Sequence, residues 1–276
     1  MLGNMLVSGG ARLGILSPER GQMMKETPME SCVAVCMGGK CVFAAEAKER
    51  AVYRLDENLL LSGVYAGGPG MRDLSVSRDG ERLYLLLGDA DSVMMLSAAD
   101  GSPMLLVRAG VNPRSMRLDR HENSVVIAGG KDGSALLLCP YTLRLQQAVR
   151  EEGICVDALL YRGVLCMLHM TGTMNSRLVL RREKGSRRVF QLSGMPGSLY
   201  ALGDELLVSA GRALYFFDAQ AMCVKKKIEA AVNEGKLLAT GSRLFLLSSV
   251  EENLYALHAE GWKLLCGDVR CASASG

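Results

Sequence analysis

The three histidines are the first side chains to consider for metal binding or proton transfer. His121 lies in a polar segment, His258 ends an apolar run, and His169 follows another apolar run. No two of them stand at the spacing of a metal-binding pair, and the sequence contains neither H-E-x-x-H nor C-x-x-C. We therefore expect the histidines to occupy turns or exposed positions.

The nine cysteines would support metal chemistry only if several of them converge. Cys32, Cys36 and Cys41 are the one group close in sequence, and Cys32 and Cys36 are separated by an even number of positions on an expected strand. That separation would place both on one face, where a soft metal could bind. However, residues 33–35 are apolar and no fourth ligand is indicated. We predict no metal and no cofactor, with reduced thiols that behave as small hydrophobic groups.

The composition permits a large core and argues against several classes of function. Of the 276 residues, 49% are hydrophobic, 22% are charged and 5% are aromatic, and the net charge is +3. This charge is too small to indicate nucleic acid or a membrane as partner, and the aromatic content is low for a base-stacking groove. Neither a signal-peptide pattern nor an apolar run of about 18 residues occurs. We expect a cytoplasmic monomer.

Any chemistry must be positioned by short strands, because apolar runs of four to six residues are interrupted by turn residues throughout the chain. One apolar run recurs seven times at intervals of 36–42 residues, each time followed by a polar turn and a second apolar run. The centres of the seven runs are Leu6, Val42, Tyr84, Val126, Cys166, Leu207 and Phe245. A four-stranded unit of about 40 residues is the blade of a β-propeller. The sequence thus predicts an all-β, seven-bladed β-propeller of four-stranded antiparallel blades.

Residues 71–110 carry a more specific pattern. S-V-S-R-D-G-E-R-L-Y at residues 75–84 is followed by D-S-V at 91–93 and A-A-D-G at 98–101. This order of strand, S-x-D-G turn and strand resembles the YVTN-type propeller repeat. The resemblance is good over residues 71–110, fair over 113–152 and limited to hydrophobic pattern elsewhere. It implies the fold and carries little information on function, because the repeat serves many functions.

The first unit begins directly in a second-strand position, so it lacks an inner strand. We expect residues 268–273 to complete the blade begun by residues 4–29 and so to close the ring without an open sheet edge. The remaining blades would span residues 31–69, 70–111, 112–153, 154–195, 196–232 and 233–267, all within one domain of residues 1–276.

Propellers most often place a site where the loops between blades meet at the mouth of the central channel. Six charged residues fall in or near those loops and are the candidate ligand-binding residues: Arg72, Asp73, Asp89, Asp91, Arg114 and Asp157. The arginines could bind an anion, or they could pair with aspartates in a structural role. No catalytic residue is assigned.

A second candidate is a basic surface. Arg181, Arg182, Arg187 and Arg188 lie in one expected blade, and Lys225 and Lys226 fall in the outer-strand region of the next. Such residues protect an outer strand from edge-to-edge pairing, or they dock an acidic partner.

We predict a non-catalytic binding scaffold that presents its loops to a protein or peptide partner. One alternative is a lactonase-type propeller that hydrolyses a sugar lactone, which requires a carboxylate to converge with histidine or arginine at the channel mouth. A redox or quinone-binding propeller is a third possibility, although aromatic residues and metal ligands are scarce.

Overall fold

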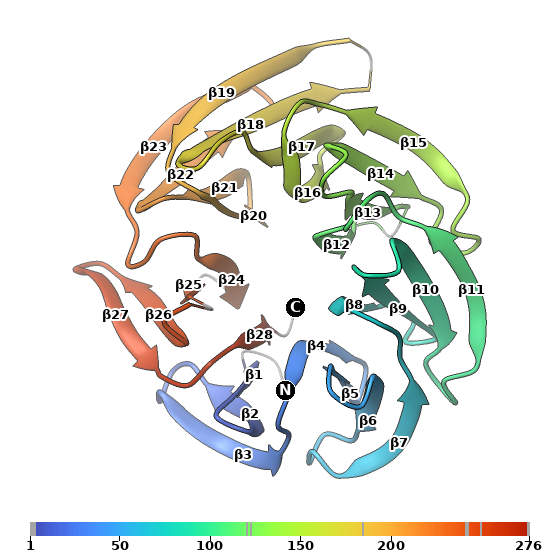
Figure 1. Cartoon of the computed structure of the whole chain (residues 1–276). Coiled ribbons are helices and arrows are strands. Elements are labelled where there is room, and N and C mark those ends of the chain that lie inside the picture. The colour runs from blue at the N-terminus through green and yellow to red at the C-terminus, as the bar shows by residue number, and fades with distance from the viewer. Residues whose placement is uncertain are drawn as a thin grey trace. The chain divides into compact units, whose positions relative to one another are not determined.

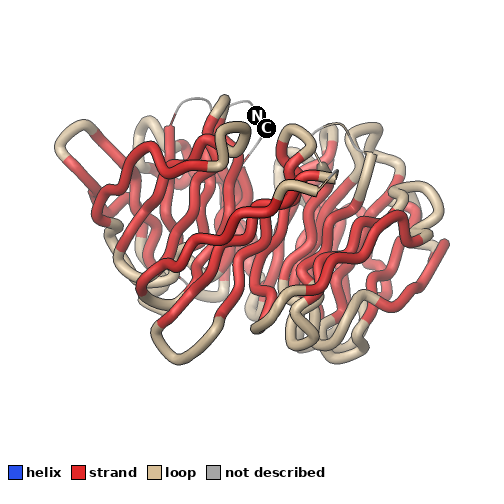
Figure 2. The backbone as a smooth tube through the Cα atoms, turned by 90° about the horizontal axis from the view of Figure 1, so that it is seen from above, coloured by secondary structure: helices blue, strands red, loops and turns tan. Residues whose placement is uncertain are grey.

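The computed structural model describes residues 4–119, 121, 123–183, 185–240, 243–248 and 250–274. In these residues the backbone forms strands and turns only, arranged as seven four-stranded antiparallel sheets (Figure 1, Figure 2). The predicted seven-bladed β-propeller class is confirmed. None of the described elements is a helix that could cross a membrane. The chain divides into two compact units, and the single domain of residues 1–276 stays a prediction.

The first unit comprises Met1–Arg108 and Leu238–Gly276. Its sheets, in order along each sheet, are β28 (Cys271–Ala274), β1 (Met5–Gly9), β2 (Arg12–Ser17) and β3 (Gln22–Pro28); β4 (Cys32–Gly38), β5 (Cys41–Glu46), β6 (Ala51–Leu55) and β7 (Leu61–Ala66); β8 (Met71–Val76), β9 (Arg82–Leu87), β10 (Ser92–Ser97) and β11 (Pro103–Arg108); and β24 (Lys236–Thr240), β25 (Arg243–Ser248), β26 (Asn253–His258) and β27 (Gly261–Cys266).

The second unit comprises Ala109–Leu237. Its sheets are β12 (Ser115–Leu118), β13 (Val125–Ala128), β14 (Ser134–Leu138) and β15 (Leu145–Arg150); β16 (Ile154–Tyr161), β17 (Val164–Met170), β18 (Asn175–Arg182) and β19 (Arg187–Ser193); and β20 (Pro196–Leu202), β21 (Glu205–Ala210), β22 (Ala213–Asp218) and β23 (Cys223–Glu229).

The repeat at residues 71–110 shows why these segments form blades. Leu83 to Leu86 of β9 are fully buried, which explains an apolar run without polar alternation, since both faces of the strand are covered. The outer strand β11 is exposed along most of its length. Between β8 and β9, Gly80 adopts a φ of +74° and the Ser77 hydroxyl donates to Asp79 at 2.5 Å. This hydroxyl and further donors lower the pKa of Asp79 and fix the turn.

The composite blade predicted from the sequence is confirmed. The C-terminal strand β28 pairs antiparallel with β1, with Val7 opposite Ala272 and Ser8 opposite Cys271. The strand occupies residues 271–274, slightly later than the expected 268–273. Backbone bonds from Arg270 N to Ser8 O, 2.7 Å, and from Val269 N to Glu252 O, 2.8 Å, hold the segment that leads into it. The strand thereby covers what would be an open edge of β1.

Two expectations from the cysteines and histidines are wrong. A β-bulge between Cys32 and Ala34 inserts a residue into β4, so that Cys32 and Cys36 pack in different hydrophobic clusters on opposite faces of the sheet. In the second unit, His169 is fully buried in β17 rather than exposed. Burial, followed by the charge of Arg177, lowers the pKa of His169 to about 4, so the ring is neutral at neutral pH.

Candidate functional site

In the first unit, Arg72 and Asp89 are brought together, whereas Asp73 bonds the backbone. Arg72 Nη2 lies 3.8 Å from Asp89 Oδ1, and the two side chains are 29% and 64% exposed. Asp73 Oδ1 accepts a hydrogen bond from the backbone N–H of Leu74 at 3.0 Å. Asp91 sits in the β9–β10 turn with a φ of +50°. An ion pair this open to water contributes at most about 1 kcal/mol, so Arg72 can still exchange Asp89 for another anion.

Two glycines make room for that pair. A Cβ at Gly88 would lie 1.8 Å from Arg72 Nε, and a Cβ at Gly70 would lie 2.4 Å from the Asp89 carboxyl carbon. Gly70 also has a φ of +64°, which other residues rarely adopt. The arginine and the aspartate therefore lie directly against backbone at the ends of β8 and β9.

In the second unit, Asp157 forms a buried ion pair with Arg117. The carboxylate accepts from Arg117 Nη2 at 2.7 Å and from Arg117 Nε at 3.1 Å, and its side chain is only 3% exposed. The Ser115 hydroxyl donates to the same carboxylate at 2.7 Å, and the backbone N–H groups of Ala158 and Leu199 donate at 3.0 and 2.8 Å. These donors come from β12, β16 and β20, so one carboxylate joins three sheets of the unit.

The contacts of Asp157 identify what it does in this unit. Five donors occupy its two oxygens, which leaves little acceptor capacity for a ligand. The carboxylate on which the hydrolase alternative depended is therefore engaged in structural contacts. Arg114 immediately precedes β12 and its backbone N–H donates to Ala128 O at 2.9 Å.

Sequence reasoning missed Arg117 and Ser115. Both lie on β12, whereas the sequence indicated the neighbouring loop residue Arg114. The available signal was their spacing, because residues two apart on a strand share a face. A serine and an arginine on one face of an otherwise apolar inner strand require a buried acceptor, and Asp157 supplies it.

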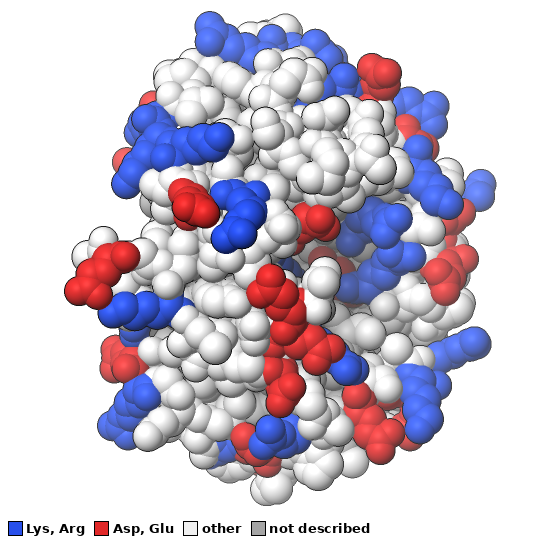
Figure 3. Space-filling model, turned by 60° about the vertical axis from the view of Figure 1, so that its left-hand side comes forward, with Lys and Arg blue, Asp and Glu red and all other residues white. Residues whose placement is uncertain are grey.

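The predicted basic residues form an exposed surface on the second unit, which we call the basic surface: Arg181 and Arg182 at the end of β18, Arg187 and Arg188 at the start of β19, and Lys225 to Lys227 on β23. Lys184, which stands between β18 and β19 in sequence, lies outside the described residues. All seven named side chains are exposed. Blue side chains gather in the upper part of the face drawn in Figure 3, on the side of β19 and β23.

Two of these seven cations are neutralised by carboxylates. Arg187 donates two hydrogen bonds to Glu151, at 2.9 and 2.6 Å, and these hold the pKa of the Glu151 carboxyl below its ordinary value. Lys225 lies 3.8 Å from Glu205 and 3.9 Å from Asp218. Arg182 and Arg188 instead donate to backbone oxygens of the β22–β23 turn, Gln220 O and Met222 O, which ties the two sheets together and leaves both charges uncompensated.

The remaining lysines are held in place by aromatic rings. Lys226 Nζ lies 5.7 Å from the centre of the Phe216 ring and Lys227 Nζ lies 5.2 Å from that of Tyr215. Each ammonium group lies over the face of a ring at a cation–π distance, and both lysines remain exposed. Within the described residues, no carboxylate lies within 4.0 Å of the charged groups of Arg181, Arg182, Arg188, Lys226 or Lys227. Strands β18, β19 and β23 thus present five uncompensated cations: Arg181 and Arg182 on β18, Arg188 on β19, and Lys226 and Lys227 on the edge strand β23.

No protein-family model and no curated protein matches the chain. Several solved structures are similar to it. The chain is similar to a functionally unknown protein from Desulfotomaculum acetoxidans, with 10% identity, a TM-score of 0.77 and coverage of 96% of this chain and 95% of that one. It is also similar to the dihydro-heme d1 dehydrogenase NirN, with 18% identity, a TM-score of 0.70 and coverage of 94% and 61%.

A third similar structure is BamB from Moraxella catarrhalis, with 13% identity, a TM-score of 0.65 and coverage of 96% of this chain and 84% of that one. At these identities the likeness concerns the fold alone. The three proteins carry different descriptions on one architecture, as expected when function lies in loops and surfaces rather than in the strands. The chain has the β-propeller fold.

Proposed function

We propose that this protein is a drifted YVTN-type propeller that acts in the cytoplasm as a monomeric, non-catalytic scaffold and docks an acidic segment of a protein partner on its basic surface. The observation that carries the proposal is the group of five exposed cations without a carboxylate partner on neighbouring strands of the second unit. Exposed, fixed cations favour association with an anionic partner and raise its rate. The nine free thiols are consistent with a reducing compartment.

Protecting an edge strand from pairing with another edge would require only a few scattered charged residues. Here Lys225, Lys226 and Lys227 are consecutive, and two of them rest on aromatic rings that restrict their rotamers. Restricting a lysine before binding reduces the side-chain entropy lost when a partner carboxylate arrives. This arrangement favours docking over simple protection.

The test uses a variant that removes charge without removing a known contact between sheets. Arg181→Gln, Lys226→Gln and Lys227→Gln are combined, because Arg182 and Arg188 also bond backbone carbonyls of the next sheet. The probe is a fluorescent peptide of alternating glutamate and serine, measured by anisotropy. At about 0.5 kcal/mol for each exposed pair, the triple variant should bind about tenfold more weakly. Binding should also weaken as salt is raised from about 0.05 to 0.3 M.

The matched control removes three exposed cations elsewhere, by Arg20→Gln, Lys40→Gln and Arg144→Gln, and so changes net charge equally. This control should retain wild-type affinity. Equal weakening by both triples would mean that total charge rather than the basic surface attracts the probe, and no measurable binding by the wild type at low salt would refute the proposal. Affinity purification from the native host, with both triples in parallel, then identifies the partner.

A further inference from the structure

A separate cavity lies in the first unit, where the chain passes from the first sheet to the second. It has a volume of about 320 Å³ and opens between the end of β3, the connection to β4, and strands β5 to β7. Its lining residues are Thr27, Pro28, Met29, Glu30, Glu46, Lys48, Glu49, Tyr53, Leu55 and Leu61. This volume is at the lower end of the range of about 300–1,000 Å³ that holds small molecules.

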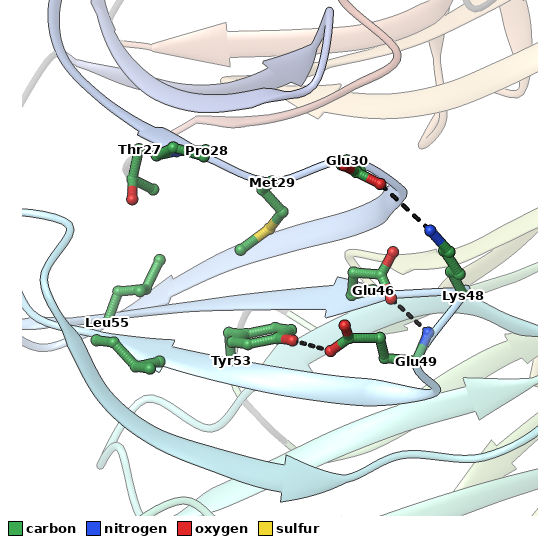
Figure 4. Close-up of a pocket in the computed structure, with 10 residues that line it drawn as sticks. Thr27, Pro28, Met29, Glu30, Glu46, Lys48, Glu49, Tyr53 and Leu55 are labelled. Atoms are coloured by element: carbon green, nitrogen blue, oxygen red, sulfur yellow. Dashed lines mark hydrogen bonds and ion pairs between the residues drawn. The ribbon is translucent and has the colours of Figure 1, made fainter.

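The lining is divided into an apolar end and a charged end (Figure 4). Met29 and Leu55 are buried beside the cavity, with Leu55 at the end away from the acidic residues. The side chains of Glu30, Glu46, Lys48 and Glu49 gather at the opposite end. A ligand that fills the whole cavity therefore needs an apolar body and a polar head.

Glu46 determines the sign of that head. It is the last residue of β5, is 5% exposed, and accepts the backbone N–H of Glu49 at 2.6 Å. Within the described residues, no lysine, arginine or histidine lies within 4.0 Å of its carboxylate. A buried carboxylate that faces a cavity without a cation is costly to desolvate, and a ligand cation would offset that cost.

The groups around Glu46 add to the preference for a cation. The Tyr53 hydroxyl donates to Glu49, and that contact, with burial and the charges of Glu49 and Glu46, raises the pKa of Tyr53 to about 12. At the rim, Lys48 Nζ lies 3.4 Å from Glu30, and both side chains are largely exposed. In the structure Lys48 pairs with Glu30, and among the described residues no cation lies within 4.0 Å of Glu46 or Glu49, so these two carboxylates stand at the charged end.

We propose that this cavity binds an alkylammonium group, with the ammonium between Glu46 and Glu49 and the alkyl chain against Met29 and Leu55. An ammonium group carries three N–H donors, enough to hydrogen-bond both carboxylates. The binding site does not depend on the basic surface, which belongs to the other unit. The alkylammonium is either a free aliphatic amine or the side chain of a lysine in a peptide, which present the same chemistry to the cavity.

Isothermal titration calorimetry with the full chain tests the proposal. Pentylammonium should bind with one saturable site, whereas 1-pentanol and pentanoate, which match its length without the positive charge, should not. Glu46→Gln keeps the shape and the acceptor for the Glu49 N–H but removes the charge, so it should weaken pentylammonium binding at least tenfold. Nα-acetyl-lysine methylamide is titrated as a second ligand. If it binds more tightly than pentylammonium, the natural ligand is a lysine in a peptide, and if it binds more weakly, the natural ligand is a free amine.

Glu49→Gln provides a second variant at an exposed position, in case Glu46→Gln alters folding, and should also weaken binding. Glu19→Gln, an exposed carboxylate on the β2–β3 turn, is the matched control and should bind pentylammonium as the wild type does. The proposal is overturned if pentylammonium gives no saturable heat, if 1-pentanol binds equally well, or if both Glu46→Gln and Glu49→Gln bind it unchanged.

Discussion

Replacing Asp157 by asparagine should destabilise the protein because it removes the carboxylate from its buried ion pair with Arg117. Arg117 and Asp157 meet through two hydrogen bonds, and their side chains are 25% and 3% exposed. Removing one partner of a buried pair typically costs about 3–5 kcal/mol. Water can reach part of Arg117, so the lower end of that range applies. We expect a loss of about 3 kcal/mol in the free energy of unfolding.

Urea unfolding followed by circular dichroism measures this loss, since the signal reports the strands directly. The midpoint should fall while the slope with urea stays constant, as expected when stability changes and the surface exposed on unfolding does not. In a thermal experiment, about 3 kcal/mol corresponds to about 6 °C for a chain of this size.

A double-mutant cycle then tests whether the loss arises from the pair itself. Arg117→Met alone should also destabilise, because Asp157 remains buried without its cation. The double variant should lose less than the sum of the two single variants, by about 1.5 kcal/mol or more. This outcome would show that the two side chains are coupled.

The opposite outcome would assign Asp157 a different role. If the carboxylate were kept for a ligand, its removal would leave stability unchanged or raise it, because functional carboxylates are commonly held at a cost to stability. A loss below about 1 kcal/mol for Asp157→Asn, or no coupling with Arg117→Met, would therefore refute the structural role.

Two further predictions follow from buried groups. Because the pKa of His169 is lowered to about 4 from an unfolded value near 6.5, the unfolded chain binds the proton first as pH falls. The stability that the neutral ring contributes is thus fully present above pH 6.5 and is lost as pH falls through about 4, by up to about 3 kcal/mol. His169→Gln should flatten this part of the pH–stability curve, while His258→Gln, at an exposed position, should not; an unchanged curve for His169→Gln would contradict the assignment. Cys32 and Cys271 have their Sγ atoms 3.7 Å apart, so oxidation with diamide should join them, with loss of two thiols and reduction of diamide to the hydrazine. Peptide mapping should find β4 linked to β28 and unfolding should require more heat, and mapping that recovers both as separate alkylated cysteines would argue against this pairing.

The periodicity of the sequence was sufficient for the architecture. Continuous apolar runs such as Leu83 to Leu86, broken by turns such as the one at Gly80, describe strands that are covered on both faces. The missing inner strand of the first repeat likewise indicated that the C-terminal segment pairs with it, as β28 pairs with β1. The local pattern carries this information because strand length and turn chemistry are set by neighbours in sequence.

Counting residues along a strand gave the wrong position where the backbone bulges or where a partner distant in sequence covers the strand. Counting residues placed Cys32 and Cys36 on one face, but a single bulge in β4 reverses the alternation, and apolar side chains do not signal a bulge. His169 could not be located by counting either, because its burial depends on the covering of β17 by residues far away in sequence.

The candidate sites likewise divide into one that the sequence indicates and others that only the structure shows. The exposed basic residues of β18, β19 and β23 could be identified from the sequence, because charged side chains on outer strands and at strand ends remain in water. The pairing of Asp157 with Arg117, and the cavity beside Glu46, each require segments about 20 to 40 residues apart to meet at hydrogen-bonding or contact distance. Sequence by itself determined the strands, the repeat and the exposed charge. Only the tertiary structure decided which carboxylates are occupied by the fold and which face open space, because a buried charge is defined by its partners rather than by its neighbours in the chain.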